Sequence, residues 1–229
     1  MYTIRVRELP ETGETYHVYN RSVEKRDVFM DDGDHLRFLH YLYHHNDTGS
    51  GENLRYILPR TNIYEVGPRK SERRERVVDV VAYALMPNHY HLMLRQLVNG
   101  GISMFMQRVG TAYTMFFNAK HEHSGTLFQG KYKCKRIEND VQLRYLPHYI
   151  HVNPLPIVQH TESAAMFDKL LQYRWSSLRD YLNIQNFPSV IQAAYILDMY
   201  GGSTEYRKDL EQHLVAANDD TEVLGNLTQ

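Results

Sequence analysis

The sequence has few of the features that mark disulfide-stabilised or membrane-spanning proteins. Its 229 residues include one cysteine, Cys134, which excludes a disulfide framework and a zinc site built from cysteines. No apolar run approaches the roughly 18 residues that cross a bilayer. The opening MYTIRVRELPETGE does not resemble a signal peptide. We therefore expect a cytoplasmic protein without a membrane partner.

The chain also has no excess of positive charge. Its formal net charge is −1 at pH 7, which argues against a protein that coats nucleic acid through its overall charge. Any binding of nucleic acid would therefore need local basic patches. One such patch is KYKCKR at 131–136. In a strand, alternation places Lys131, Lys133 and Lys135 on one face and Tyr132 and Cys134 on the other. Three lysines in a row suit contact with a phosphate backbone.

Hydrophobic periodicity predicts strands and helices in alternation. The strand patterns are 14–23, 77–86, 89–97 and 125–138, with 77–97 forming a hairpin of two central strands. The helical patterns are 28–46, 103–120 and 140–154; Pro147 lies inside the last, so that helix is expected to begin either at 140 or near Pro147. This order predicts an α+β fold, a ferredoxin-like antiparallel sheet with helices packed on it. We also expect a long loop at 47–76 and a C-terminal helical extension.

Two histidines flank one tyrosine in the stretch YALMPNHYHLML. Residues two apart in a strand share a face, so His89 and His91 project together while Tyr90 enters the apolar layer. Two adjacent imidazoles can each give one nitrogen to a cation. The same pattern is also common on plain polar surfaces, and the pair alone does not decide between the two.

The helix predicted over 140–154 offers partners for the histidine pair. Tyr149 and Asn153 are four residues apart and share a helix face. The Asn153 amide oxygen would complete a site of two histidines and one oxygen, and the Tyr149 phenol beside a metal would be a covalent nucleophile. Tyr145 is an alternative nucleophile on the same face, whereas the apolar neighbours of Tyr113 predict a core residue.

Four motifs in order carry a resemblance to a known family. MPNHYHLML, SGTLFQGKYK, YIHVNP and YRWSS resemble those of the REP-associated tyrosine transposases, which are single-tyrosine HUH transposases. The resemblance extends from about Tyr16 to Tyr181 and implies a catalytic domain over 1–160 and a C-terminal helical accessory region over 161–229. It also implies that His89, His91 and Asn153 hold a divalent metal, Mg²⁺ or Mn²⁺.

The resemblance implies an enzyme that cleaves and rejoins hairpin-flanked single-stranded DNA. Tyr149 would form a covalent 5′-phosphotyrosine intermediate, and the partner would be a REP-like palindromic hairpin. We expect this hairpin's phosphates to contact Lys131, Lys133, Lys135 and Arg136, and the protein to be DNA-associated and a monomer or homodimer. Two alternatives remain. One is a metal-dependent nuclease that uses water, with Asp79 or Glu138 as its base; the other is a nucleic-acid-binding protein without catalysis.

Overall fold

The computed structural model describes residues 9–49, 75–157 and 163–219, so most of the predicted 47–76 loop lies outside it. Its four strands form one antiparallel sheet in the order β2-β3-β1-β4. These strands are β1 (Thr15–Arg21), β2 (Val78–Met86), β3 (His89–Gln96) and β4 (Lys133–Arg136). The helices are α1 (Asp32–His44), α3 (Gly101–Lys120), α4 (Asp140–Val152), α5 (Ser163–Gln172), α6 (Leu178–Tyr181), α7 (Ala194–Tyr200) and α8 (Ser203–Asp219), with a short 3₁₀ turn at Val23–Lys25.

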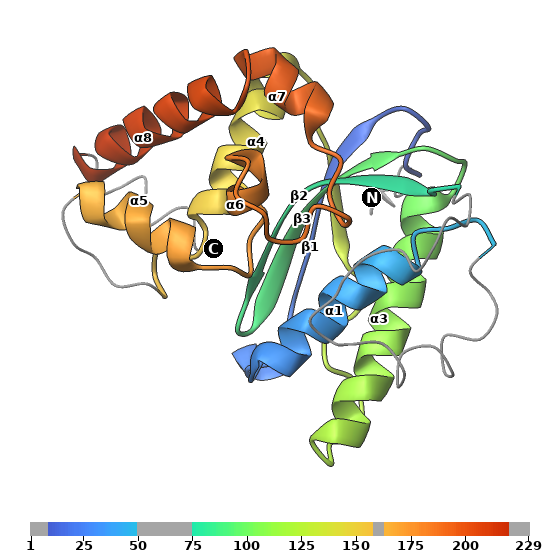
Figure 1. Ribbon diagram of the computed structural model, residues 1–229. Helices are drawn as coiled ribbons and strands as arrows, with labels where there is room; N and C mark the ends of the chain where they lie inside the picture. Colours follow the sequence, from blue (N-terminus) through green and yellow to red (C-terminus); the bar gives the residue numbers. More distant parts are fainter. Residues whose placement is uncertain (1–8, 50–74, 158–162, 220–229) are drawn as a thin grey trace, which may run out of the picture.

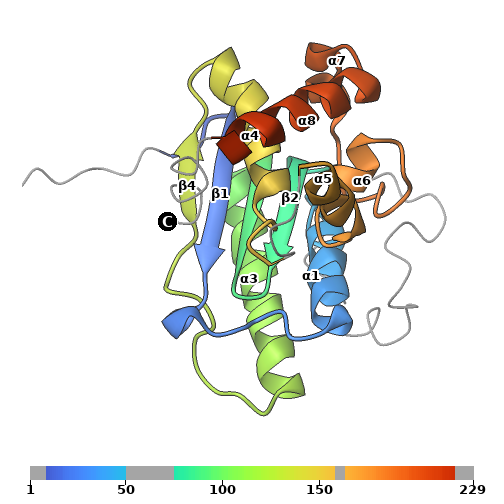
Figure 2. The same cartoon turned by 90° about the vertical axis from the view of Figure 1, so that its left-hand side faces the viewer.

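Helices cover both faces of the sheet. Helices α1 and α3 pack on one face, while α4 and the C-terminal helices lie on the other (Figures 1 and 2). Each face has its own buried core: Val18, Tyr90 and Leu92 belong to the α1–α3 side, and Ala84 and Met93 to the α4 side. The predicted α+β class and ferredoxin-like antiparallel sheet are confirmed.

Two predicted details of the strands are wrong. β2 was predicted to be a central strand, but it lies at the end of the sheet. Residues 175–177 cover its outer edge through hydrogen bonds such as Leu85 N–H to Trp175 O at 2.9 Å, so an apolar strand is protected there. The strand expected over 125–138 shrinks to β4, since positive φ angles at Gly125 and Gly130 break the extended chain. Helix α4 begins at Asp140, which confirms the first of the two starts expected from the sequence; the Asn139 side chain caps it.

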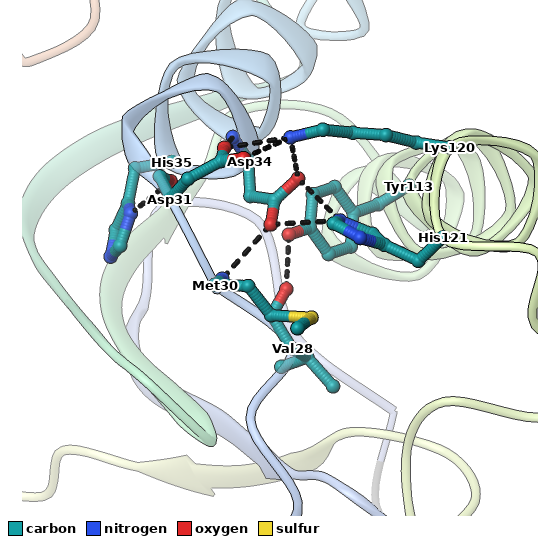
Figure 3. Close-up of polar contacts among 8 residues, drawn as sticks. All are labelled: Val28, Met30, Asp31, Asp34, His35, Tyr113, Lys120 and His121. Carbon is teal, nitrogen blue, oxygen red and sulfur yellow. Dashed lines mark hydrogen bonds and ion pairs between the residues drawn. The ribbon is translucent and has the colours of Figure 1, made fainter.

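A buried carboxylate ties α1 to α3. Asp34, in the first turn of α1, has a fully buried side chain. Lys120 Nζ lies 2.8 Å from Asp34 Oδ1, and His121 Nε2 lies 3.1 Å from the same oxygen (Figure 3). Tyr113 is fully buried and donates its hydroxyl hydrogen to Val28 O, which confirms the prediction of a core residue.

The C-terminal helices share their core with α4. Leu170, Leu178 and Leu210 belong to the same apolar cluster as Ile150 of α4. The predicted boundary at 160 between a catalytic domain and an accessory region stays a prediction. Across this sequence boundary, side chains from both parts pack into one core. Among the described helices, none has the length and apolar character needed to cross a membrane.

Candidate active site

Strand β3 presents the two histidines as its alternation predicts. Tyr90 and Leu92 enter the core under α1 and α3, so His89 and His91 face the opposite side, where α4 crosses the sheet (Figure 2). The Tyr90 hydroxyl, although buried, hydrogen-bonds with Asn20. One strand thus carries both a core face and a polar face.

Helix α4 brings the predicted tyrosine and asparagine to the same place. The Tyr149 and His91 rings lie 5.5 Å apart between centroids, edge to face. Asn153, which caps the end of α4, holds its Oδ1 atom 3.3 Å from His89 Nε2. The Asn153 side chain also hydrogen-bonds with Tyr149. The structure therefore brings together Tyr149, His89, His91 and Asn153.

The hydrogen bonds of His89 leave room for a cation. Asn88 Nδ2 donates to Lys25 O at 3.1 Å, which turns Asn88 Oδ1 toward His89 Nδ1 at 2.6 Å. On the other side, His89 Nε2 faces Asn153 Oδ1. A neutral imidazole has one N–H, so it can donate to only one of these two oxygens. A cation between Nε2 and Oδ1 would resolve the remaining contact between two lone pairs.

The histidines are held in the neutral form that metal coordination needs. Burial lowers the pKa of His89 to about 4, against a smaller opposing effect of the Asn153 hydrogen bond. Burial also holds the pKa of His91 well below its usual range, with His17 and His89 adding to the effect. Among the described residues, no three His, Cys, Asp or Glu side chains are arranged to hold a metal. The Asn153 amide oxygen beside His89 is an oxygen of the kind that divalent cations accept, so His89, His91 and Asn153 would fit such an ion.

Tyr149 is a protonated phenol in its resting environment. Burial raises its pKa, while the Asn153 hydrogen bond and the positive charge of Arg21 lower it. A hydrogen bond that lowers a phenol's pKa is one donated to the phenol oxygen, because it stabilises the phenolate. The site therefore contains two groups that favour the nucleophilic form of Tyr149.

A pocket of about 850 Å³ opens at this site between the sheet and α4. Besides the four residues above, the charged side chains lining it are Arg21, Asp27, Lys131, Lys133 and Lys135. Four cations against one carboxylate make the lining positive in a chain whose net charge is −1. An anionic ligand is the chemistry that such a lining attracts.

The predicted lysine row reaches the pocket, but Arg136 does not. Lys131, Lys133 and Lys135 are exposed along it, while Tyr132 and Cys134 pack on the other face of the sheet. Arg136 is absent from the described pocket lining and forms ion pairs at 3.3 Å with Glu11 and 3.1 Å with Glu14. The role of all four in DNA binding stays a prediction, and the geometry favours it for the lysines only.

Sequence reasoning missed the contribution of β1. His17, Tyr19 and Arg21 line the pocket, and His17 Nε2 lies 2.8 Å from His91 Nδ1. The signal was present in the alternation of YHVYNR, which turns Tyr16 and Val18 inward and these three residues the other way. Only the pairing of β1 beside β3 shows that this face meets the histidines.

Comparisons with known proteins concern part of the sequence and the fold. Residues 69–153, which include β2, β3, α3, β4 and α4, match the family described as "Transposase IS200 like". This segment of the chain is similar to IS200-like transposases. A solved structure described as a REP-associated tyrosine transposase bound to a REP hairpin is similar in fold, with a TM-score of 0.51 and 12% identity.

The structural match extends beyond the segment that matches the family. It covers 83% of this chain and 92% of the solved one. At this level of identity the match shows a shared fold, and it therefore confirms the fold expected from the sequence motifs. No curated protein sequence matches the chain closely enough to count as a relative.

Proposed function

We propose that this protein is a tyrosine transposase that cleaves and rejoins single-stranded DNA beside hairpins. The observation that carries the proposal is the meeting of Tyr149 and Asn153 from α4 with His89 and His91 from β3 in a positively lined pocket. The matching family and the hairpin-bound structural neighbour point to the same chemistry and the same class of substrate.

Tyr149 supplies the nucleophile. Its phenol oxygen forms a bond to the phosphorus, the bond from phosphorus to the 3′ oxygen breaks, and the phenol proton passes through solvent to the departing 3′ oxygen. The products are a 5′-phosphotyrosine and a free 3′-hydroxyl. Attack of a 3′-hydroxyl on the phosphotyrosine reverses these steps and restores Tyr149, so strand transfer needs no nucleotide cofactor.

The neighbouring residues bind and orient the phosphate. His89, His91 and Asn153 would hold a divalent metal, Mg²⁺ or Mn²⁺, which when bound draws charge from the phosphate oxygens. The Asn153 amide also holds the Tyr149 phenol through its hydrogen bond. Lys131, Lys133 and Lys135 would contact phosphates of the flanking strand.

The decisive test compares two tyrosines of α4 that both line the pocket. A single-stranded hairpin labelled at its 3′ end, the end that stays with the 5′-phosphotyrosine, is incubated with Mn²⁺, and protein-linked DNA is read on a denaturing gel. We expect the adduct with the wild type and with Tyr145→Phe, and none with Tyr149→Phe. An adduct that persists in Tyr149→Phe and disappears in Tyr145→Phe would move the nucleophile one turn along the helix.

The same experiment separates the two alternative functions. A nuclease that uses water would release cleaved DNA over many turnovers without a trapped adduct. Neither acid suggested by the sequence is placed for that role, since Asp79 and Glu138 are absent from the described pocket lining, where the carboxylate is Asp27. A binding protein without catalysis would retain the hairpin uncleaved.

A further inference from the structure

His17 occupies a position directly behind a proposed metal ligand. It lies on β1, and its Nε2 atom is 2.8 Å from Nδ1 of His91. The two rings stack with centroids 5.0 Å apart, and the Tyr19 ring stacks on both of them. The His17 ring also meets the Tyr149 ring edge to face at 5.6 Å.

A hydrogen bond between two imidazoles needs one nitrogen that donates and one that accepts. If His17 donated, His91 Nδ1 would accept, the single proton of His91 would sit on Nε2, and no nitrogen of this ring could bind a cation. If His91 donates from Nδ1, its Nε2 keeps a lone pair. Only the second arrangement is compatible with His91 as a ligand.

The other histidine is anchored in the same way. Asn88 Oδ1 lies 2.6 Å from His89 Nδ1, and its orientation is set by the bond from Asn88 Nδ2 to Lys25 O. In both histidines Nδ1 therefore faces an anchoring side chain and Nε2 is the nitrogen left for a cation, with Asn153 Oδ1 opposite that of His89. Such outer partners of metal-binding histidines fix the tautomer and the ring orientation.

We propose that His17 is a positioning residue that accepts the Nδ1–H of His91 and thereby presents His91 Nε2 to a divalent cation. This inference rests on the metal site of the proposed function. The His17 ring also packs edge to face on the Tyr149 ring, so this one side chain of β1 aligns both the proposed ligand on β3 and the proposed nucleophile on α4.

Two substitutions separate the acceptor from the ring. His17→Phe keeps a flat ring that can stack on His91 and Tyr19 but has no acceptor. His17→Gln loses the ring and keeps an acceptor oxygen at a similar distance from the backbone. A purely structural role predicts the greater harm from His17→Gln, whereas the positioning role predicts the greater harm from His17→Phe.

Mn²⁺ binding to the full-length, DNA-free protein is the first readout, measured from the free-ion signal in electron paramagnetic resonance. We expect His17→Phe to weaken binding by about 10–100-fold and His17→Gln to stay close to the wild type. Equal binding by the wild type and His17→Phe would overturn the proposal, as would equal loss in both variants.

The second readout is the tautomer of His91, observed by ¹⁵N nuclear magnetic resonance without metal and assigned with His91→Gln. We expect a proton on Nδ1 in the wild type and in His17→Gln, and a mixture of tautomers in His17→Phe. A wild-type proton on Nε2 would overturn the proposal.

These outcomes are distinguishable from failure of the proposed function. If the wild type binds Mn²⁺ with the expected ranking of variants but yields no DNA adduct, tyrosine chemistry is wrong and the role of His17 stands. If the wild type makes the adduct and His17→Phe binds Mn²⁺ normally, only the role of His17 is wrong. A wild type that binds no Mn²⁺ overturns the metal site and this inference together.

Discussion

The buried hydrogen bonds of His151, on α4, allow a quantitative prediction of how much they contribute to the stability of the protein. His151 Nδ1 lies 2.6 Å from the Tyr206 hydroxyl on α8, and Nε2 lies 2.7 Å from Ser177 Oγ. Ser177 Oγ also accepts from Tyr83 N–H at 2.9 Å. All four residues are fully buried. One assignment satisfies every group: Tyr206 donates to Nδ1, Nε2–H donates to Ser177, and Ser177 donates to Tyr83 O.

Tyr206→Phe removes one hydroxyl group from this series of hydrogen bonds and leaves the aromatic ring in place. His151 Nδ1 is then left without a donor in a site that water does not reach, which costs about 1–3 kcal/mol. Because burial holds the pKa of His151 well below its usual range, protonation does not relieve the defect at neutral pH. We expect the free energy of unfolding to fall by about 2 kcal/mol. At a urea dependence of about 2 kcal/mol per M, the midpoint would fall by about 1 M.

Urea unfolding followed by circular dichroism measures this loss. Tyr145→Phe, which changes a 40% exposed side chain, is the matched control, with an expected effect below about 0.5 kcal/mol. In a His151→Leu background, Tyr206→Phe should lower the free energy of unfolding by less, because no His151 Nδ1 is left without a hydrogen-bond donor. The reasoning is refuted if Tyr206→Phe costs as little as the control, or costs the same in both backgrounds.

Two further predictions concern charge. Replacing Lys131, Lys133 and Lys135 together by Gln should reduce the slope of log affinity for a single-stranded hairpin against log salt by about 2, measured by fluorescence anisotropy, because each lost phosphate contact contributes about 0.7. Arg136→Gln should leave that slope unchanged, since Arg136 is paired with Glu11 and Glu14. Burial among Tyr200, Tyr206 and His213 outweighs the half-exposed Asp209 and lowers the pKa of His148 to about 4. The unfolded chain then binds this proton more readily, so stability is fully present above about pH 6.5 and falls as the pH drops toward 4, by at most about 3 kcal/mol. His148→Gln should flatten this part of the profile in urea unfolding between pH 4.5 and 7.5, and an unchanged slope would contradict the assignment.

Local patterns were sufficient to predict the sheet and most of its elements. The period of two in 89–97 and the helical period in 103–120 correspond to β3 and α3 within two residues. The failures arose where tertiary contacts override local pattern. Nothing near β2 in sequence shows that residues 175–177 cover its outer edge. The extent of β4 depended on backbone angles at Gly125 and Gly130 that the letters alone do not set.

The site was predictable where both partners lie in recognisable motifs. His89, His91, Tyr149 and Asn153 are each two or four residues from a partner, so periodicity alone placed them in pairs. His17 stood outside this logic, because its contact with His91 spans 74 residues and depends on which strands are neighbours. Arg136 failed for the opposite reason: its charge suggested a DNA contact, but alternation along β4 turns it away from the lysines.

The strand order gives the site its layout. β3 contributes the histidine pair, and β1 contributes His17, Tyr19 and Arg21. Two lysines come from β4, and Lys131 lies two residues before it. Register places Tyr19 between His91 on one side and Lys133 on the other, and Lys133 Nζ lies 5.6 Å from the Tyr19 ring centre. Neighbouring strands are about 4.8 Å apart, so the histidines and the lysines are separated by about 10 Å across β1. Under the proposed function, a DNA strand that crossed the sheet in this direction would meet Tyr149 and the two histidines first, then Tyr19 and Arg21 of β1, then the lysines. Motifs that are distant in the sequence thus line one surface, because β1 lies between β3 and β4, two strands that come much later in the sequence.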